Sequence, residues 1–371
     1  MEPKLSRFLH SKGKPLGLPI AGTFELTPRC NFHCKMCYVH LTEEEQRQRG
    51  KELTTEQWLE IGKQARDAGT VFLLLTGGEP TLRPDFPELL HRFKNMGLMV
   101  SVNSNGVLLD GKLLQEMIND PPVRFNISLY GTSNETYEKQ CGVPAYDRVM
   151  RNIRALREAG VDVKVNMSLT PDNRDDMKAV YETAKELDAR TQATPYMFPP
   201  IRLHPELCGE NFRLNAEEAG KQQAEYDFIR YPKDEFLRRI RALHELCSPD
   251  SPDEEDDGVE NCMHCRAGTT AFWIDWDGKM VPCGQMAEPA ADVLALGFDE
   301  AWEQTKKNAG MIRLPAECAS CEIREICHVC AAMCCCETGS FDKRPEYVCR
   351  MKKTYIAEMD RIFESEYGGM L

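Results

Sequence analysis

The sequence lacks both a long apolar run and an excess of basic residues. No segment approaches the roughly 18 consecutive apolar residues of a membrane-spanning helix, and the amino terminus has no apolar core of a secretory signal. Asp and Glu outnumber Lys and Arg by 59 to 46, without a basic run that would attract a phosphate backbone. We therefore expect a cytoplasmic protein that contacts neither membrane nor nucleic acid.

Cysteine, in contrast, is abundant, with 17 in 371 residues. In a reducing compartment such thiols indicate metal binding rather than disulfides. Three lie within residues 30–37 and twelve lie between Cys247 and Cys349. The remaining two, Cys141 and Cys208, are interpreted as small buried apolar residues.

The first cysteine group has the sequence Cys30-Asn-Phe-His-Cys34-Lys-Met-Cys37. Electron-transfer clusters usually take four cysteines, so three thiolates leave one iron of a four-iron cluster open. An open coordination position is typical of catalytic metal sites. The alternative is a structural zinc site, with His33 or His40 as the fourth ligand.

Between residues 20 and 200, short apolar runs alternate with amphipathic helical patterns. Strands are expected at 20–26, 71–75, 98–103, 124–129, 161–169 and 191–197, and helices at 54–68, 86–96, 111–118, 146–159 and 175–187. This alternation predicts an α/β fold with a parallel sheet and right-handed crossovers, a partial (βα)6 TIM-like barrel. Active sites in such barrels lie at the carboxyl ends of the strands.

Three of the expected strand ends have polar or glycine-rich sequences. The second is followed by Thr76-Gly-Gly-Glu-Pro80, where glycines allow close backbone approach to a ligand and the carboxylate can accept hydrogen bonds from an ammonium group. The third ends in Ser104-Asn-Gly106, which suits a turn as well as a binding site. The fourth ends near Ser128.

Together, the cysteine triplet and the Gly-Gly-Glu-Pro motif resemble the radical S-adenosylmethionine (SAM) superfamily. The resemblance implies that Cys30, Cys34 and Cys37 hold a [4Fe–4S] cluster whose open iron binds SAM. It assigns contacts with the SAM amino group, ribose and carboxylate to Gly77, Gly78, Glu79, Ser104, Asn105 and Ser128.

The chain is expected to divide into an extension (1–19), the barrel (20–200), a helical and acidic linker (201–260), a cysteine-rich domain (261–350) and a terminal helix (351–371). The linker is expected to form helices at 215–230 and 234–246, followed by an acidic surface loop at 248–258. Asp277-Gly278 lies between two alternating apolar runs, which predicts a β-hairpin with a type I′ turn. A helix is expected at 352–366, directly after Cys349.

The cysteines after residue 260 resemble the SPASM extension of radical SAM enzymes, a twitch-like fold with two auxiliary [4Fe–4S] clusters. The resemblance assigns one cluster to Cys318, Cys321, Cys327 and Cys349, and the other to Cys262, Cys265 and Cys283 with a fourth ligand. The family spacing would place that ligand at Ala331, but the chain has Cys330, which we favour, and Cys334 is the alternative. The roles of Cys335 and Cys336 stay open, and CxxC pairs are also typical of zinc.

The resemblance implies reductive cleavage of SAM to a 5′-deoxyadenosyl radical, which takes hydrogen from a peptide or protein. A ribosomal-peptide maturase that forms thioether or carbon–carbon crosslinks is favoured. A sulfatase-maturing enzyme is less favoured, because that group has an Asp after its equivalent of Cys283, where this chain has Gly284. No catalytic base is assigned.

The expected partners are a flavodoxin- or ferredoxin-like one-electron donor and, because few residues precede the first strand, a separate leader-peptide-binding protein. An interpretation of another class is a non-catalytic iron–sulfur electron carrier or zinc-stabilised interaction module.

Overall fold

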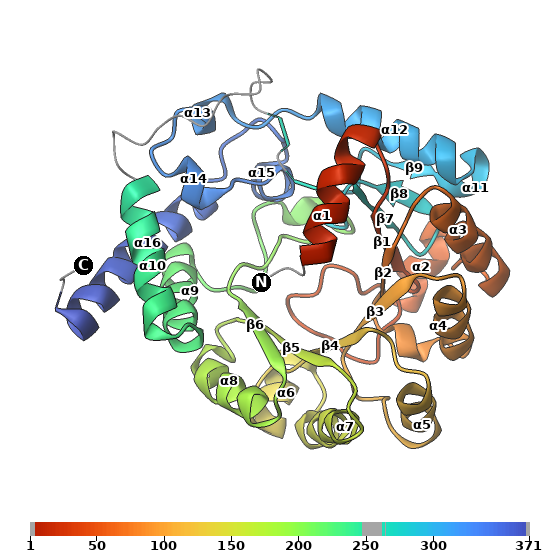
Figure 1. Cartoon of the computed structure of the whole chain (residues 1–371), viewed down its shortest axis with the longest axis horizontal. Helices are drawn as coiled ribbons and strands as arrows, with labels where there is room; N and C mark the ends of the chain where they lie inside the picture. The colour runs from red at the N-terminus through yellow and green to blue at the C-terminus, as the bar shows by residue number, and fades with distance from the viewer. Residues whose placement is uncertain (1–3, 247–261, 264, 369–371) are drawn as a thin grey trace.

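The computed structural model describes residues 4–246, 262–263 and 265–368 (Figure 1). At its centre is a curved sheet whose first six strands are parallel and lie side by side in chain order. Helices lie along the outside of these strands (Figure 1). The predicted α/β fold with a six-stranded partial barrel is confirmed. Its strands are β1 (Ala21–Glu25), β2 (Phe72–Thr76), β3 (Met99–Ser104), β4 (Arg124–Ser128), β5 (Val163–Ser168) and β6 (Arg190–Thr194).

The five barrel helices that the sequence predicts lie close to their predicted positions, whereas three further helices, at Lys4–Gly13, Glu43–Arg49 and Asn134–Cys141, were not predicted. One of the predicted helices is α3 (Thr55–Asp67). It begins with a capping box between Thr54 and Gln57, and its apolar face buries Trp58 and Ile61. The others are α1 (Lys4–Gly13), α2 (Glu43–Arg49), α4 (Phe86–Asn95), α5 (Gly111–Asn119), α6 (Asn134–Cys141), α7 (Tyr146–Glu158) and α8 (Met177–Glu186).

Side chains alternate along each strand between the outer helices and the inside of the barrel. In β4, Phe125 and Ile127 are fully buried, whereas Arg124, Asn126 and Ser128 are half-buried. The apolar side chains therefore form the core beneath the helices, and the polar ones face the centre.

The sheet does not end at β1. Strand β7 (Ala271–Ile274) pairs parallel to β1, and β8 (Lys279–Val281) and β9 (Ala291–Asp292) follow it. The ring of Phe272 occupies the space where a side chain of Gly22 would lie, 2.4 Å from an ideal Cβ. The predicted hairpin thus extends the barrel sheet, and it covers an edge of β1 that would otherwise be unpaired.

The turn of this hairpin differs from the predicted type I′. Gly278 N donates to Asp275 O and Asp275 N donates to Lys279 O, both at 2.9 Å, so the connection has three residues rather than two. Gly278 has a φ of +90° and Asp277 has no positive φ, whereas a type I′ turn requires both. The longer connection lets Trp276 bury its side chain against Leu41 and Leu203.

Several helices of the second half pack against the open side of the barrel, whereas the helix Phe298–Met311 packs against α3, β8 and β9 (Figure 1). The terminal helix α16 (Glu346–Tyr367) begins earlier than predicted, so Cys349 lies in its first turn. The others are α9 (Ala216–Arg230), α10 (Lys233–Leu246), α11 (Val293–Leu296), α12 (Phe298–Met311), α13 (Ala316–Ala319), α14 (Arg324–Cys327) and α15 (Ala331–Thr338). The acidic loop expected at 248–258 lies outside the described residues. No helix in the described ranges is long and apolar enough to cross a bilayer.

A pair of glycine substitutions tests how closely α9 and α16 pack. A Cβ on Gly220 of α9 would lie 2.4 Å from Met351 O of α16, whereas a Cβ on Gly310 of α12 would meet nothing within 4 Å. We expect Gly220→Ala to lower the free energy of unfolding by about 1–2 kcal/mol despite the better helix propensity of alanine. Gly310→Ala should raise it by about 0.5 kcal/mol. Chemical denaturation measures both, and a stabilising Gly220→Ala would contradict this packing.

Candidate functional site

The cysteine loop follows β1 and runs beside the glycine-rich end of β2. Gly78 N donates to Thr27 O at 2.7 Å, and Glu79 N donates to Arg29 O at 2.8 Å. A Cβ on Gly77 would lie 2.4 Å from Thr27 O, and one on Gly78 would lie 2.3 Å from Arg29 O. The two glycines therefore allow close approach, but to the backbone that leads into the cysteine loop, where the N–H groups of Gly78 and Glu79 donate.

The carboxylate of Glu79 connects the second strand end to the third. It is fully buried and accepts hydrogen bonds from Thr81 N and Oγ1, from Ser104 Oγ at 2.9 Å and from Asn105 N at 2.6 Å. Burial raises the pKa of Glu79, and these hydrogen bonds oppose that rise. Within the described residues, no cationic side chain forms an ion pair with it.

Asn105 takes part in a turn and also lies at the candidate site, the two roles considered for it in the sequence. Its Oδ1 accepts from Val107 N at 3.0 Å, which is turn chemistry. Its Nδ2 donates to Asn31 Oδ1 at 2.8 Å and lies 3.9 Å from Cys30 Sγ. Ser128, at the end of β4, is half-buried, and its backbone O accepts from Tyr137 Oη at 3.2 Å.

The surroundings of the three cysteines fit a cluster bound through thiolates. Cys30 Sγ accepts from Phe32 N at 3.4 Å and Cys37 Sγ accepts from His40 N at 3.3 Å. Such donors stabilise negative charge on cluster sulfurs. Burial raises the pKa of Cys37 to about 11, so iron binding there must release a proton.

The end of α6 also holds the cysteine loop, a contact that the sequence analysis did not predict. His33 N donates to Cys141 O at 2.8 Å and Lys35 N donates to Gln140 O at 3.2 Å. A hydrogen bond to the Cys141 thiol and then burial raise the pKa of Cys34. Cys141 is buried, as expected, but it lies against a candidate cluster ligand. In the sequence, the isolated Cys141 was the only feature that could have indicated this contact with the cysteine loop.

Four cysteines of the carboxyl-terminal region surround one cavity. Cys318, Cys321, Cys327 and Cys349 line a space of about 250 Å³. Arginine and lysine side chains line it too, and they suit an anionic cluster; they are Arg324, Arg344, Arg350 and Lys353. The structure therefore brings together the four residues that the resemblance assigns to one auxiliary cluster.

The structure also brings together part of the second predicted set of cluster ligands, namely Cys265, Cys283 and Cys330. Burial raises the pKa of Cys283 to about 11, and the adjacent Cys330 and Cys265 thiolates add to the rise. Cys283 and Cys330 also pack in the same cluster of side chains. Burial likewise raises the pKa of Cys334 to about 12, and there the largest thiolate contribution comes from Cys318.

The remaining cysteines occupy different surroundings. Cys262 is half-buried, Cys335 lies near Cys208, and Cys336 Sγ donates to Gln285 O at 3.6 Å. In the described ranges, no three His, Cys, Asp or Glu side chains converge as the ligands of one metal ion do. This is compatible with a four-iron cluster, because each of its cysteine ligands binds a different iron and the thiols are therefore farther apart than the ligands of a single ion.

A buried charged triad lies where β1 meets the hairpin. Arg202 Nη2 donates to Glu25 Oε2 at 2.8 Å, and Arg202 also pairs with Asp275. Trp273 Nε1 donates to the same oxygen of Glu25 at 3.1 Å. Burial raises the pKa of Glu25, and Arg202 opposes that rise. Glu25 Oε1 and Arg202 Nε have no hydrogen-bond partner among the described residues.

Comparisons with known proteins agree with this geometry. The model of the radical SAM superfamily matches residues 24–184. A probable GTP 3′,8-cyclase of Saccharolobus solfataricus is 36% identical over 288 residues, which cover 76% of this chain and 88% of that protein. The chain belongs to the radical SAM superfamily. The predicted radical SAM enzyme is thus confirmed, and the non-catalytic interpretation is wrong.

Further similar proteins are more distant. An AdoMet-dependent heme synthase of Methanosarcina barkeri is 25% identical, over 87% of this chain and 94% of that protein. A PqqA peptide cyclase of Streptomyces rochei is 26% identical, over 84% of each. The solved structures of Streptococcus suis SuiB and of anSMEcpe with bound AdoMet share the fold. Their TM-scores are 0.67 and 0.68 at 18% and 16% identity, covering 93% and 95% of this chain and 81% and 100% of theirs.

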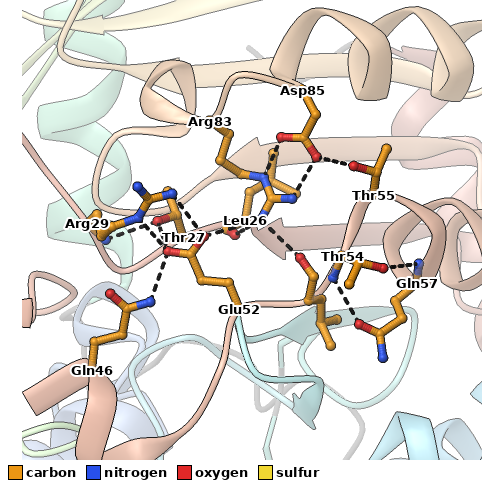
Figure 2. Close-up of polar contacts among 11 residues, drawn as sticks. Leu26, Thr27, Arg29, Gln46, Glu52, Thr54, Thr55, Gln57, Arg83 and Asp85 are labelled. Atoms are coloured by element: carbon orange, nitrogen blue, oxygen red, sulfur yellow. Dashed lines mark hydrogen bonds and ion pairs between the residues drawn. The ribbon is translucent and has the colours of Figure 1, made fainter.

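In this radical SAM chain, a buried polar network fixes the segment before the cysteine loop (Figure 2). Arg83 donates to both carboxylate oxygens of Asp85, at 2.9 and 2.7 Å, and to Leu26 O at 3.1 Å. Glu52 accepts two hydrogen bonds from Arg29, at 2.7 and 3.0 Å. Figure 2 shows these side chains converging between the strand ends and the start of α3. Although burial opposes it, the hydrogen bond from Arg83 lowers the pKa of Asp85.

Removal of Arg83 should destabilise the radical SAM barrel. Arg83 is 7% exposed, and its loss leaves buried carboxylate and carbonyl oxygens without a donor. We expect Arg83→Ala to lower the free energy of unfolding by about 3 kcal/mol. Arg92→Ala, at an arginine that is 53% exposed in an i,i+4 pair, should cost under about 0.5 kcal/mol. Equal effects of the two substitutions in urea denaturation would show that the network does not stabilise the fold.

Proposed function

We propose that Cys30, Cys34 and Cys37 hold a [4Fe–4S] cluster and that SAM binds beside it, at the carboxyl ends of β1 to β4. The observation that supports this most directly is the backbone pairing between residues 27–29 and 78–79, which sets the cysteine loop against Glu79. The buried carboxylate of Glu79 has no cationic partner among the described side chains, so it suits the ammonium group of SAM.

Cys30, Cys34 and Cys37 would hold a cluster that, once reduced, would supply the one electron needed to cleave SAM to methionine and a 5′-deoxyadenosyl radical able to take hydrogen from a substrate. The side chains prepare this step. Phe32 N, His40 N and Asn105 Nδ2 offer hydrogen-bond donors to the thiolates, and the apolar core behind the strands keeps water away. A flavodoxin- or ferredoxin-like protein is proposed as the source of the electron.

Two auxiliary clusters are proposed in a SPASM-type region. One is assigned to Cys318, Cys321, Cys327 and Cys349, and the cavity that these residues line supports the assignment. The other is assigned to Cys262, Cys265, Cys283 and Cys330. Cys330 packs in the same cluster of side chains as Cys283, which favours it over Cys334 as the fourth ligand. These clusters would accept the electron left on the oxidised substrate.

The substrate that we propose is a peptide or protein, in which the enzyme forms a thioether or carbon–carbon crosslink. The name of the PqqA peptide cyclase among the relatives supports this class. The similar fold of SuiB, which has been solved with its precursor peptide SuiA, agrees with it. A separate protein that binds a leader peptide is a proposed partner.

Sulfatase maturation is less favoured by the surroundings of Gly284. An ideal Cβ on this residue would lie 2.5 Å from the ring of Trp273, so the Asp expected in that group would displace the indole. A second candidate is a reaction on a small molecule, which the name of the AdoMet-dependent heme synthase among the relatives supports. A basic cavity at the barrel edge favours this candidate.

Two cysteine substitutions distinguish the role of the SAM-binding cluster from the role of the auxiliary clusters. The protein reconstituted without oxygen should contain about twelve irons. Cys34→Ala should abolish the release of 5′-deoxyadenosine with dithionite, because the SAM-binding cluster is lost. Cys321→Ala should retain most of this cleavage. Iron counting and chromatography measure both, and equal loss of cleavage in the two variants would refute the division of roles.

Substitution of Glu79 tests the proposed SAM contact. Glu79→Gln removes the charge that would bind an ammonium group, so we expect SAM to bind about ten- to a hundred-fold more weakly. Glu88→Gln, at an exposed residue of α4, is the matched control and should leave affinity unchanged. Equilibrium dialysis with the oxidised, cluster-loaded protein measures this, and unchanged affinity of Glu79→Gln would exclude the contact.

A further inference from the structure

A large cavity lies between the last barrel strand and the helices of the second half. It has a volume of about 1150 Å³ and is lined by β6, α8, α9, α10, α14 and α16. In Figure 1, β6 is the last strand of the barrel, and α9 and α10 lie across from it. The cavity therefore occupies the open side of the partial barrel.

The lining of this cavity is basic, although the chain has a net charge of −13. Three acidic side chains line it, Asp188, Asp227 and Glu325, against seven basic ones. The basic residues are Arg124, Lys164, Lys185, Arg190, Arg230, Arg239 and Lys352. A concave surface of one charge sign attracts ligands of the other sign.

Three of these cations stand on adjacent strands. Lys164 of β5 is directly opposite Arg190 of β6, and Arg124 begins β4 beside them. Asp162 pairs with both Arg124 and Arg190, whereas Lys164 Nζ donates to Gln192 Oε1. Burial lowers the pKa of Lys164, and the surrounding arginines lower it further. Like charges in facing positions destabilise a sheet, so this arrangement suits a ligand that supplies negative charge.

The same cavity has an aromatic lining and reaches the cysteine-rich region. Tyr181, Tyr226 and Tyr355 contribute ring faces and hydroxyl groups. At the carboxyl end of β6 the lining includes Phe198, which packs in the cluster of side chains that contains Cys283 and Cys330. The cavity thus extends from the amino ends of β5 and β6, where Lys164 and Arg190 stand, to the edge of the cysteine-rich region.

We propose that this cavity binds the carboxylates of the substrate, with Lys164 as the central cation and the tyrosines against its apolar part. The inference rests on the proposed function and names its substrate class: a molecule with several carboxylates, either an acidic peptide segment or a small polycarboxylate.

The test uses the cluster-loaded, full-length protein and measures binding by fluorescence at low and high salt. The probes are coproporphyrin III, which is a planar tetracarboxylate, its neutral tetramethyl ester, and an acetylated peptide of alternating glutamate and tyrosine. We expect at least one acidic probe to bind, and its affinity to fall as the salt concentration rises. Lys164→Gln should weaken that binding about ten-fold, whereas Lys164→Arg should retain it. Lys178→Gln, on the exposed side of α8, is the control.

Binding of the porphyrin alone would identify a small polycarboxylate, and binding of the peptide alone would identify an acidic peptide. The proposal is overturned if neither acid binds, if the ester binds equally well, or if Lys164→Gln has no more effect than Lys178→Gln. SAM cleavage in the same preparations tests the proposed function separately. A wild-type protein that binds an acidic probe without cleaving SAM would refute that function and leave the cavity assignment standing.

Discussion

The candidate site depends on the pairing of two backbone segments beyond the ends of β1 and β2. Hydrogen bonds from Gly78 N to Thr27 O and from Glu79 N to Arg29 O continue the parallel ladder into the cysteine loop. This approach leaves no room for a Cβ at Gly77 or Gly78. Because the ladder is fixed, Glu79 is buried where it can hold the end of β3, and Asn105 reaches Cys30.

The carboxyl-terminal region is joined to the barrel through the same strand. Strand β7 pairs with the other edge of β1, so one short strand borders both the cysteine triplet and the hairpin that precedes Cys283. The triad of Glu25, Arg202 and Asp275 lies at this junction. A buried cation shared by two carboxylates holds three segments of the chain together at the cost of their desolvation. The distance between the cysteine groups is therefore set by a continuous sheet rather than by a flexible linker.

Charge is distributed unevenly over this acidic chain. The exposed helices contain most of the carboxylates, often in pairs such as Glu135 with Lys139, whereas the cavity beside β6 concentrates cations. Surface pairs of that kind contribute little to stability. The basic cavity instead retains facing cations on β5 and β6, an arrangement that folding alone does not favour.

The sequence by itself determined the order of the six barrel strands and of the five helices predicted between them, because each of these strands is a short apolar run and each of these helices has one apolar face. It also determined the family, through cysteine spacing and the Gly-Gly-Glu-Pro motif, which are local. The turn at Asp277 and the start of α16 were predicted incorrectly, because burial of Trp276 and packing against α9 decided them.

Only the tertiary structure decided which distant residues meet. Cys141 touches Cys34, Arg202 joins Glu25 to Asp275, and Lys164 faces Arg190 although 26 residues separate them. No local pattern encodes such contacts, because they depend on strand register and on where separate segments pack. The sequence thus determined which chemistry is available, and the fold decided where those groups come together.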